Sequence, residues 1–233
     1  RGGQGVSAPG WKGMALLSLF REYPLLGEKL PYISFGEFPT PVQKLHRLGP
    51  ELGAGRLYVK RDDLSGSVYG GNKVRKLEFL LGEALREGAG EVMTFGAAGS
   101  NHALATAVYA RQAGLGSVSM LRPQPNARYV RKNLLLSRAA GAELHYYPDD
   151  VSLQRGVDDQ CRIHAEITGV SPWIIPMGGT SPLGTAGFVN AAFELRDQVR
   201  EGLLPEPDLM YAALGSMGAA AGLLLGLLAA GLK

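Results

Sequence analysis

Three cationic side chains open a segment whose apolar residues recur at helical spacing. The predicted helix begins within Gly70-Gly71-Asn72-Lys73-Val74-Arg75-Lys76, so that Lys73, Arg75 and Lys76 occupy its first turn. Because a helix N-terminus carries partial positive charge, cations are unfavourable there unless an anion lies among them. The pattern therefore indicates a bound anion such as phosphate, and a desolvated lysine beside it can also be a nucleophile. The alternative is a glycine turn before an ordinary solvated helix.

Two more glycine-rich segments join a predicted strand to a predicted helix. The first, Gly99-Ser100-Asn101-His102, brings a hydroxyl, an amide and an imidazole to a helix start that could hold a carboxylate. The second, Gly215-Ser216-Met217-Gly218-Ala219, could wrap a phosphate with its backbone N–H groups. Ligands of open α/β sheets collect at such junctions, although each segment alone is more typical of a helix cap or a tight turn.

The sequence lacks the motifs of several other enzyme classes. No Gly-x-Gly-x-x-Gly fingerprint with a downstream acid is present, which disfavours a nicotinamide dinucleotide, and no Walker loop occurs. No group of His, Cys and carboxylate residues has metal-ligand spacing, and Ser100 has no identifiable Asp-His pair. We therefore expect no metal site and no serine triad.

Charge and cysteine content are those of an ordinary globular chain. The 233 residues include 24 Lys and Arg against 21 Asp and Glu, scattered without a long basic run, so nucleic-acid binding is not indicated. Cys161 is the only cysteine, which excludes an intrachain disulfide and suits a reducing cytoplasm. Residues 1–13 are glycine-rich, and we expect them to be a disordered leader before Met14.

Strand-like and helix-like segments alternate along most of the chain. The predicted strands are 56–60, 91–95, 118–121, 143–147, 173–175 and 209–214, and the predicted helices are 72–88, 101–113, 126–140, 153–168 and 185–201. Alternation of this kind indicates parallel βαβ units, so the predicted class is α/β.

The uncharged stretch 209–232 allows a second interpretation. It is long enough to span a bilayer, and Gly218, Gly222 and Gly226 recur at the spacing of a membrane helix-packing face. Pro207-Asp208 and Gly215-Ser216 interrupt it, which favours a buried strand, a turn and a separate helix over a membrane anchor.

Six motifs taken in order resemble the D-cysteine desulfhydrase and 1-aminocyclopropane-1-carboxylate deaminase family of pyridoxal-phosphate enzymes. They are Phe38-Pro39-Thr40-Pro41, Lys60-Arg61-Asp62-Asp63, Gly70-Gly71-Asn72-Lys73, Gly99-Ser100-Asn101-His102, Gly178-Gly179-Thr180-Ser181-Pro182-Leu183-Gly184 and Gly215-Ser216-Met217-Gly218. The resemblance that they carry extends over nearly everything after Met14. The resemblance implies a tryptophan-synthase-β-like fold of type II, in which two parallel-sheet α/β domains hold the cofactor between them.

The resemblance also implies roles for individual residues. Lys73 resembles the lysine that forms a Schiff base with pyridoxal 5′-phosphate and then acts as a base, and Lys76 resembles a phosphate contact. Asn101 is similar to the residue that hydrogen-bonds the ring hydroxyl of the cofactor, while Ser100, a second catalytic candidate, and His102 match positions facing the substrate. The remaining expected positions are the phosphate cradle Gly215, Ser216, Met217, Gly218 and Ala219, and the substrate-side residues Asn72, Asn101 and Thr180.

By the same resemblance, residues 14–76 and 185–233 form a large cofactor domain, and residues 77–184 form an inserted small domain. The implied protein is a cytoplasmic homodimer, a pyridoxal-phosphate-dependent lyase or deaminase for a small amino acid. D-cysteine desulfhydrase activity, giving pyruvate, ammonia and sulfide, is the first expectation, and 1-aminocyclopropane-1-carboxylate deaminase activity is the alternative. A catalytically silent cofactor-binding or assembly subunit is the alternative from a different class.

Two features depart from the family pattern. Most relatives have Gly-Ser-Gly-Gly-Thr in the phosphate loop, whereas this chain has Met217 and Ala219, so we expect weaker phosphate binding. Family members also continue past the position of Lys233 with elements that supply the group facing the pyridine nitrogen and an active-site tyrosine. We therefore expect the large domain to be incomplete here, with an uncovered apolar sheet edge.

Overall fold

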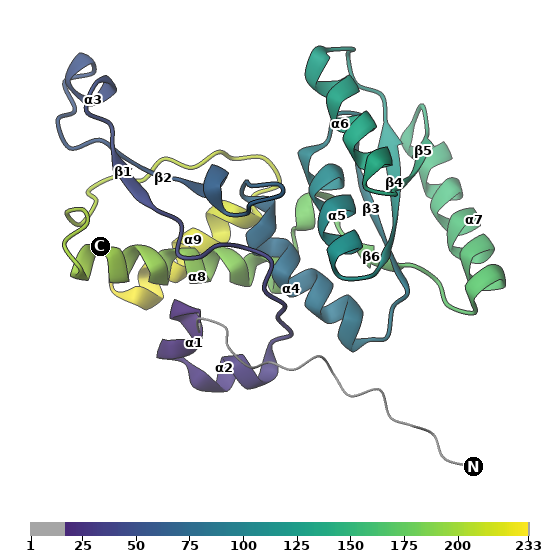
Figure 1. Ribbon diagram of the computed structural model, residues 1–233, viewed down its shortest axis with the longest axis horizontal. Helices are drawn as coiled ribbons and strands as arrows, with labels where there is room; N and C mark the ends of the chain where they lie inside the picture. Colours follow the sequence, from purple (N-terminus) through teal and green to yellow (C-terminus); the bar gives the residue numbers. More distant parts are fainter. Residues whose placement is uncertain (1–16, 233) are drawn as a thin grey trace.

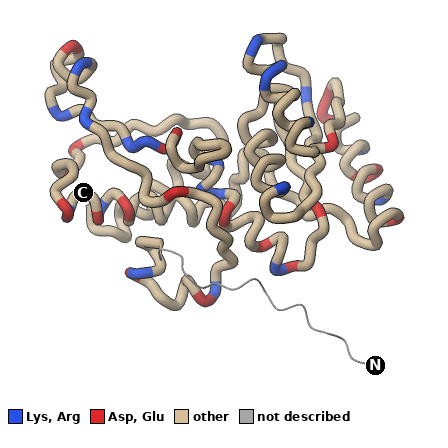
Figure 2. Tube along the Cα trace, viewed as in Figure 1, with Lys and Arg blue, Asp and Glu red and all other residues tan. Residues whose placement is uncertain are grey.

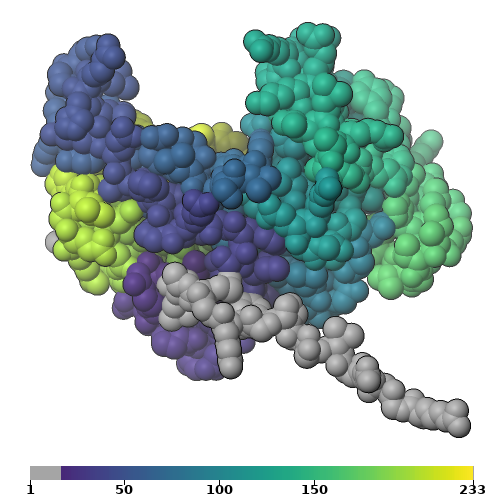
Figure 3. All heavy atoms as spheres, in the orientation of Figure 1, coloured from purple at the N-terminus to yellow at the C-terminus, as the bar shows by residue number. Residues whose placement is uncertain are grey.

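The computed structural model describes residues 17–232, so the predicted leader 1–13 and Met14 lie outside the described residues. Figure 1 shows two lobes, one built around a sheet and the other mainly helical, with helix α4 (Lys73–Arg86) running from one to the other. The space-filling view in Figure 3 shows a broad hollow between the two lobes.

One lobe holds a parallel sheet with the strand order β5-β4-β3-β6. Its strands are β3 (Glu91–Ala97), β4 (Gly116–Arg122), β5 (Glu143–Tyr146) and β6 (Trp173–Ile175), connected by helices α5 (Asn101–Gln112), α6 (Arg128–Ala139) and α7 (Asp150–Thr168). All three strand pairings are parallel. Parallel neighbours need a crossover between them, and helices supply each one here. The prediction of an α/β fold with parallel βαβ units is therefore confirmed in this lobe.

Helices cover both faces of this sheet, and each face has its own hydrophobic core. Val92 packs in a core with residues of α4 and α5, whereas the next residue, Met93, packs in a second core with Val118 and Met120. Successive side chains of a strand point to opposite faces. Leu153 of α7 packs against the second core, so α4 and α5 lie on one face and α7 on the other.

The other lobe is mainly helical and contains a short antiparallel strand pair. Strand β1 (Val42–Lys44) pairs with strand β2 (Tyr58–Lys60). The remaining elements are α1 (Ser18–Glu22), α2 (Pro24–Lys29), α3 (Leu48–Glu51), α8 (Pro182–Arg200), α9 (Gly218–Ala230) and the 3₁₀ turn η1 (Asp62–Leu64). The 3₁₀ turn η2 (Met177–Gly179) contacts β3, α4 and α5. Strand β1 was not predicted from the sequence. The domain boundaries after residues 76 and 184 stay a prediction.

Helix α9 packs against α8 through a row of glycines. A Cβ atom at Gly222 would lie 2.6 Å from the Cβ atom of Phe188, and one at Gly226 would lie 2.6 Å from the Cβ atom of Ala192. Glycine at these positions allows the two helices to approach closely. The glycines whose spacing resembled a membrane helix-packing face thus lie at the contact between two helices of this chain. Within residues 17–232, no helix combines the length and the apolar character needed to cross a membrane.

The strand predicted at 209–214 is wrong. The segment has no regular secondary structure, and Leu209, Tyr211 and Leu214 are exposed. A strand requires a neighbour to pair with its backbone N–H and C=O groups, and no strand of the described residues is paired with this segment. The turn and the separate helix predicted after it do form, the helix as α9.

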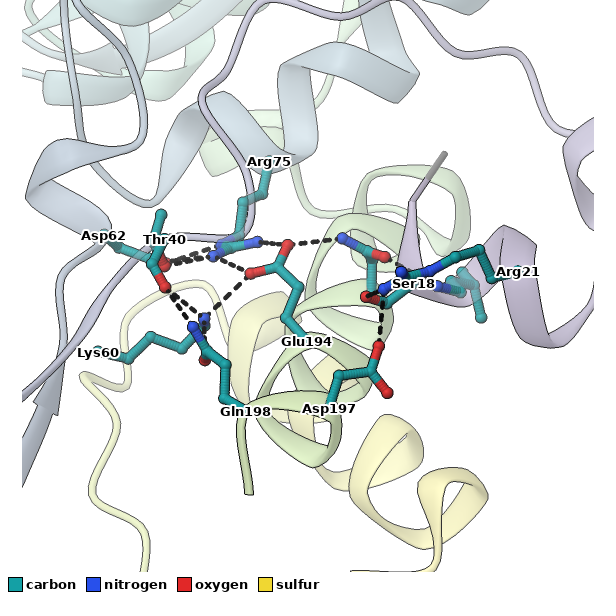
Figure 4. Close-up of polar contacts among 11 residues, drawn as sticks. Ser18, Arg21, Thr40, Lys60, Asp62, Arg75, Glu194, Asp197 and Gln198 are labelled. Carbon is teal, nitrogen blue, oxygen red and sulfur yellow. Dashed lines mark hydrogen bonds and ion pairs between the residues drawn. The ribbon is translucent and has the colours of Figure 1, made fainter. Parts of the chain in front are cut away.

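A buried cluster of charges joins the elements around the start of α4, as Figure 4 shows. Arg75 is 1% exposed and donates to both carboxylate oxygens of Glu194 on α8, at 2.8 and 3.0 Å. It also donates to both carboxylate oxygens of Asp62 on η1, at 2.8 and 3.0 Å. Lys60 on β2 contacts Glu194 at 3.0 Å. Two cations therefore face two carboxylates, which satisfies the requirement that buried charges be paired.

We expect Glu194→Gln to lower the free energy of unfolding by about 3 kcal/mol, because it leaves one positive charge uncompensated in a buried site. Urea denaturation measures the change. Glu166→Gln is the matched control, since Glu166 pairs with Arg162 on the exposed side of α7 and its loss should cost under about 1 kcal/mol. Equal losses of stability in the two variants would contradict the account.

Candidate functional site

Hydrogen bonds hold the turn that precedes α4. Gly71 donates its N–H to the Asp62 carbonyl oxygen at 2.8 Å and to Ser65 Oγ at 3.0 Å, and Ser65 Oγ donates to the Gly71 carbonyl oxygen at 2.8 Å. Gly71 has φ +123°, and a Cβ atom at Gly70 would lie 2.0 Å from the Asp63 carbonyl oxygen. Only glycine suits these two positions. The turn therefore sets the residue at which α4 begins.

Lys73 and Lys76 lie one turn apart on α4, and both are withdrawn from solvent. Lys73 is half-buried, and burial lowers its pKa. Lys76 is 1% exposed, and burial together with the charge of Lys73 lowers its pKa to about 8. An uncharged amine is the nucleophilic form, so burial favours reactivity at this turn. Asn72 occupies the N-cap position, is exposed, and makes no side-chain capping bond.

The Lys76 side chain extends to the start of α9. Its Nζ atom donates to the Gly178 carbonyl oxygen and to Thr180 Oγ1, both at 3.1 Å, and Thr180 Oγ1 donates to Ser216 Oγ at 2.7 Å. A Cβ atom at Gly218 would lie 2.9 Å from both Lys76 Nζ and Thr180 Oγ1. The backbone of the first residue of α9 is therefore packed directly against the amine, where only glycine fits.

This arrangement fits a phosphate group. Helix α9 has 13 residues, so its N-terminus carries a partial positive charge suited to an anion. Lys76 adds an amine, and Thr180 and Ser216 add hydroxyls. In the predicted cradle, residues 215–217 are exposed and Gly218 is buried. The assignment of Gly215, Ser216, Met217, Gly218 and Ala219 to a bound phosphate stays a prediction.

Arg75 does not belong to this site. The prediction that three cations share one anion is wrong for Arg75, whose guanidinium is bound to Glu194 and Asp62. Residues one or two positions apart do not face each other on a helix, so Arg75 points away from Lys73 and Lys76. Two amines, from Lys73 and Lys76, remain at the first turn.

The start of α5 lies beside the start of α4. Ser100 caps α5, because its Oγ atom accepts the Ala103 N–H at 3.1 Å. Asn101 is exposed, and its Oδ1 atom accepts from the Tyr69 hydroxyl at 3.2 Å and from Asn133 Nδ2 at 2.8 Å. Since Tyr69 directly precedes Gly70, this contact joins two of the three glycine-rich junctions.

His102 lies beneath the surface rather than on it. It is 3% exposed, and its Nε2 atom lies 2.9 Å from Thr94 Oγ1. Burial, followed by the charges of Lys73 and Lys76, lowers the pKa of His102 to about 3. Its imidazole is therefore neutral at physiological pH. A Cβ atom at Gly179 would lie 3.2 Å from His102 Cε1 and 3.3 Å from Lys76 Cδ, so His102 and Lys76 flank the same glycine.

Two residues of the site were not predicted from the sequence, Tyr69 and Asn133. Asn133 lies on the buried side of α6 with Val130 and Ser137, at helical spacing. A polar residue at a core position of an amphipathic helix was the available signal, because a buried amide needs hydrogen-bond partners. Tyr69 offered no comparable signal.

The chemistry available at the site comes from amines, hydroxyls and amides. Figure 2 shows Lys and Arg interspersed with Asp and Glu over the described chain, without a continuous band of one sign. Within residues 17–232, no three side chains of His, Cys, Asp or Glu are placed to hold a metal ion together.

A phosphorylated aldehyde cofactor requires a lysine that can bind its aldehyde and a helix N-terminus that can bind its phosphate. The site offers two lysines, one half-buried and one buried, near the N-terminus of α9. A comparison with known protein families supports this interpretation. The family described as "Pyridoxal-phosphate dependent enzyme" matches residues 33–233, a range that includes all three junctions. The chain belongs to this family of enzymes, and pyridoxal phosphate, the cofactor predicted from the motifs, is the cofactor of the family.

Individual relatives confirm the predicted family and its fold. The chain is 44% identical over 199 residues to "Putative 1-aminocyclopropane-1-carboxylate deaminase" of Pyrococcus abyssi, covering 85% of this chain and 59% of that protein. It is 37% identical over 209 residues to "D-cysteine desulfhydrase" of Salmonella typhimurium, covering 85% and 61%. A solved structure described as an ACC deaminase homologue matches with TM-score 0.73 and 36% identity, covering 92% and 62%. The chain thus spans less than two thirds of the length of these relatives.

Met217 has φ +60°, alone among the non-glycine residues of the described range in having a positive φ. We expect Met217→Gly to raise the free energy of unfolding by about 0.5–1 kcal/mol, because the strain of this conformation exceeds the entropy cost of glycine. Urea denaturation provides the measurement. Met210→Gly is the control, since Met210 lies in the preceding irregular segment without a positive φ, and this change should lower stability. The strain argument fails if both variants are destabilised.

Proposed function

We propose that this chain carries the cofactor site of a pyridoxal-phosphate-dependent lyase that acts on a small amino acid, as D-cysteine desulfhydrases do. The reaction removes the β-thiol of D-cysteine and yields pyruvate, ammonia and sulfide after hydrolysis. The observation that carries the proposal is the pairing of Lys73, half-buried with a lowered pKa, with Lys76 buried against the start of α9. Family membership and the relative named D-cysteine desulfhydrase support it.

The phosphate, the aldehyde and the ring oxygen of the cofactor each have a proposed partner in this chain. The start of α9 and the Lys76 amine would hold the phosphate, with Ser216 and Thr180 supplying hydroxyls. Lys73, one turn away, would bind the aldehyde carbon covalently, and Asn101 would face the ring oxygen. When bound, pyridoxal phosphate supplies a sink for the electrons of a bond broken at the substrate α-carbon.

Lys73 and the residues around it would then bind the substrate and transfer its proton. The Lys73 amine would serve as the base that takes the substrate α-proton. Ser100 Oγ accepts the Ala103 N–H, so its hydroxyl hydrogen can be donated to a substrate carboxylate. His102 is neutral because of its low pKa, so it would contribute shape and hydrogen bonding rather than charge. Asn72 and Thr180 complete the proposed substrate side.

A second candidate function is deamination of 1-aminocyclopropane-1-carboxylate. The relative at 44% identity is named as a putative deaminase of this compound, and the matched solved structure is described as an ACC deaminase homologue. These names favour this candidate as strongly as the first. A cofactor-binding subunit without turnover is the third candidate. Assays with D-cysteine and with the cyclopropane acid distinguish the first two, and cofactor attachment without turnover of either supports the third.

We also place the protein in the cytoplasm as a homodimer. The single cysteine suits a reducing compartment, and burial raises the pKa of the Cys161 thiol, which keeps it in the unreactive protonated form. Sedimentation velocity measures the oligomeric state.

The assignment of Lys73 predicts where the cofactor attaches. We expect borohydride reduction of the protein mixed with pyridoxal phosphate to modify Lys73, as located by peptide mass spectrometry, because reduction fixes the carbon–nitrogen bond. Lys73→Ala should lose the modification. Lys76→Met, the matched control one turn away, should keep it at Lys73 while requiring more cofactor. Modification of Lys76, or of any other lysine in its place, would contradict the proposal.

A further inference from the structure

The side chain of Asn101 accepts a hydrogen bond from a residue of a different helix. Asn133, on α6, is 7% exposed and donates through Nδ2 both to the Gly99 carbonyl oxygen at 2.9 Å and to Asn101 Oδ1 at 2.8 Å. Asn133 therefore contacts the backbone before the start of α5 and the side chain of the first helical residue.

These contacts determine which end of the Asn101 amide faces outward. A backbone carbonyl oxygen can only accept, so the Asn133 atom beside Gly99 must be its amide nitrogen. That nitrogen carries a second hydrogen, which needs an acceptor, and the atom of Asn101 that meets it must be Oδ1. The Tyr69 hydroxyl donates to the same oxygen at 3.2 Å. Because Oδ1 is engaged on this side, Nδ2 of Asn101 is on the other, exposed side.

The backbone around this contact has little room to shift. Gly99 donates its N–H to Gln124 Oε1 at 2.8 Å. A Cβ atom at Gly99 would lie 2.9 Å from Val130 Cγ2 and 3.0 Å from Gln124 Oε1. The carbonyl group that orients Asn133 is therefore fixed by close packing and by a second hydrogen bond.

We infer that Asn133 is a positioning residue that turns the amide N–H₂ of Asn101 toward the ring oxygen of the bound cofactor. The inference rests on the proposed function, in which Asn101 faces that oxygen. An N–H donor at this position favours the ionised ring oxygen over the hydroxyl, because a hydrogen bond to the charged form stabilises it. Asn133 itself touches neither cofactor nor substrate in this account.

Asn133→Asp tests the inference, because it keeps the shape of the side chain and removes both hydrogens. The amide of Asn101 would then reverse to donate to the new carboxylate, presenting Oδ1 to the ring oxygen. Binding is measured with pyridoxal phosphate and with 3-deoxypyridoxal phosphate, which lacks the ring oxygen. We expect the wild type to prefer pyridoxal phosphate by roughly 10- to 100-fold, as for a hydrogen bond to a charged group.

The variant should lose most of this preference while binding the deoxy compound as the wild type does. Gln124→Glu is the matched control, since it changes an amide to an acid in the same network but keeps the acceptor for the Gly99 N–H, and its preference should be unchanged. A merely structural role for Asn133 would weaken binding of both compounds equally, which would overturn the inference. A wild type with no preference would also overturn it.

Neutron diffraction from deuterated wild-type crystals provides a test that needs no variant and no cofactor. Deuterium atoms on Asn101 directed away from Asn133 support the inference, and deuterium atoms directed at Asn133 overturn it. Failure of the proposed function is distinguishable, because it would appear as the absence of attachment at Lys73 while the orientation of Asn101 was unaltered.

Discussion

The buried pairing of Arg75 with Glu194 and Asp62 is the interaction on which the rest of the site depends. It connects the first turn of α4 to α8 and to the 3₁₀ turn η1, which follows β2. Because the cluster is buried, each charged partner is necessary to the others. Since Arg75 points to one side of the turn, Lys73 and Lys76 are presented on the other. The same helix start thus carries a charge cluster that stabilises the fold and two amines that are available for chemistry.

Helix α4 brings together three glycine-rich junctions that are far apart in the sequence. Lys76 contacts Thr180, which contacts Ser216 at the start of α9, and Tyr69 contacts Asn101 at the start of α5. Glycine is required at these contacts because backbone approaches backbone or amine within the distance of a methyl group. The result is a set of helix starts, amines and hydroxyls around the start of α4, where we propose that a phosphorylated cofactor binds.

Features set by neighbouring residues could be predicted from the sequence, and features set by distant ones could not. The start of α4, the cap of α5 by Ser100 and the strand and helix alternation follow from local glycine, capping and periodicity signals. The direction of Arg75 depends on Glu194, 119 positions away, which no local pattern reveals. The segment 209–214 has the composition of a strand, but a strand forms only when it pairs with a partner, and no strand of the described residues is paired with it.

The most direct test of the account is the titration of Lys76 by nitrogen-15 NMR of the lysine side-chain amines. The account predicts that the Lys76 amine titrates with a pKa of about 8 in the free protein, lowered by burial and by Lys73. Pyridoxine 5′-phosphate, which has the phosphate but no aldehyde, should raise that pKa, because a neighbouring anion favours the charged amine. A Lys76 pKa in the ordinary range of a solvated lysine, unchanged by the phosphate compound, would contradict the claim that α4 and α9 together form an anion site.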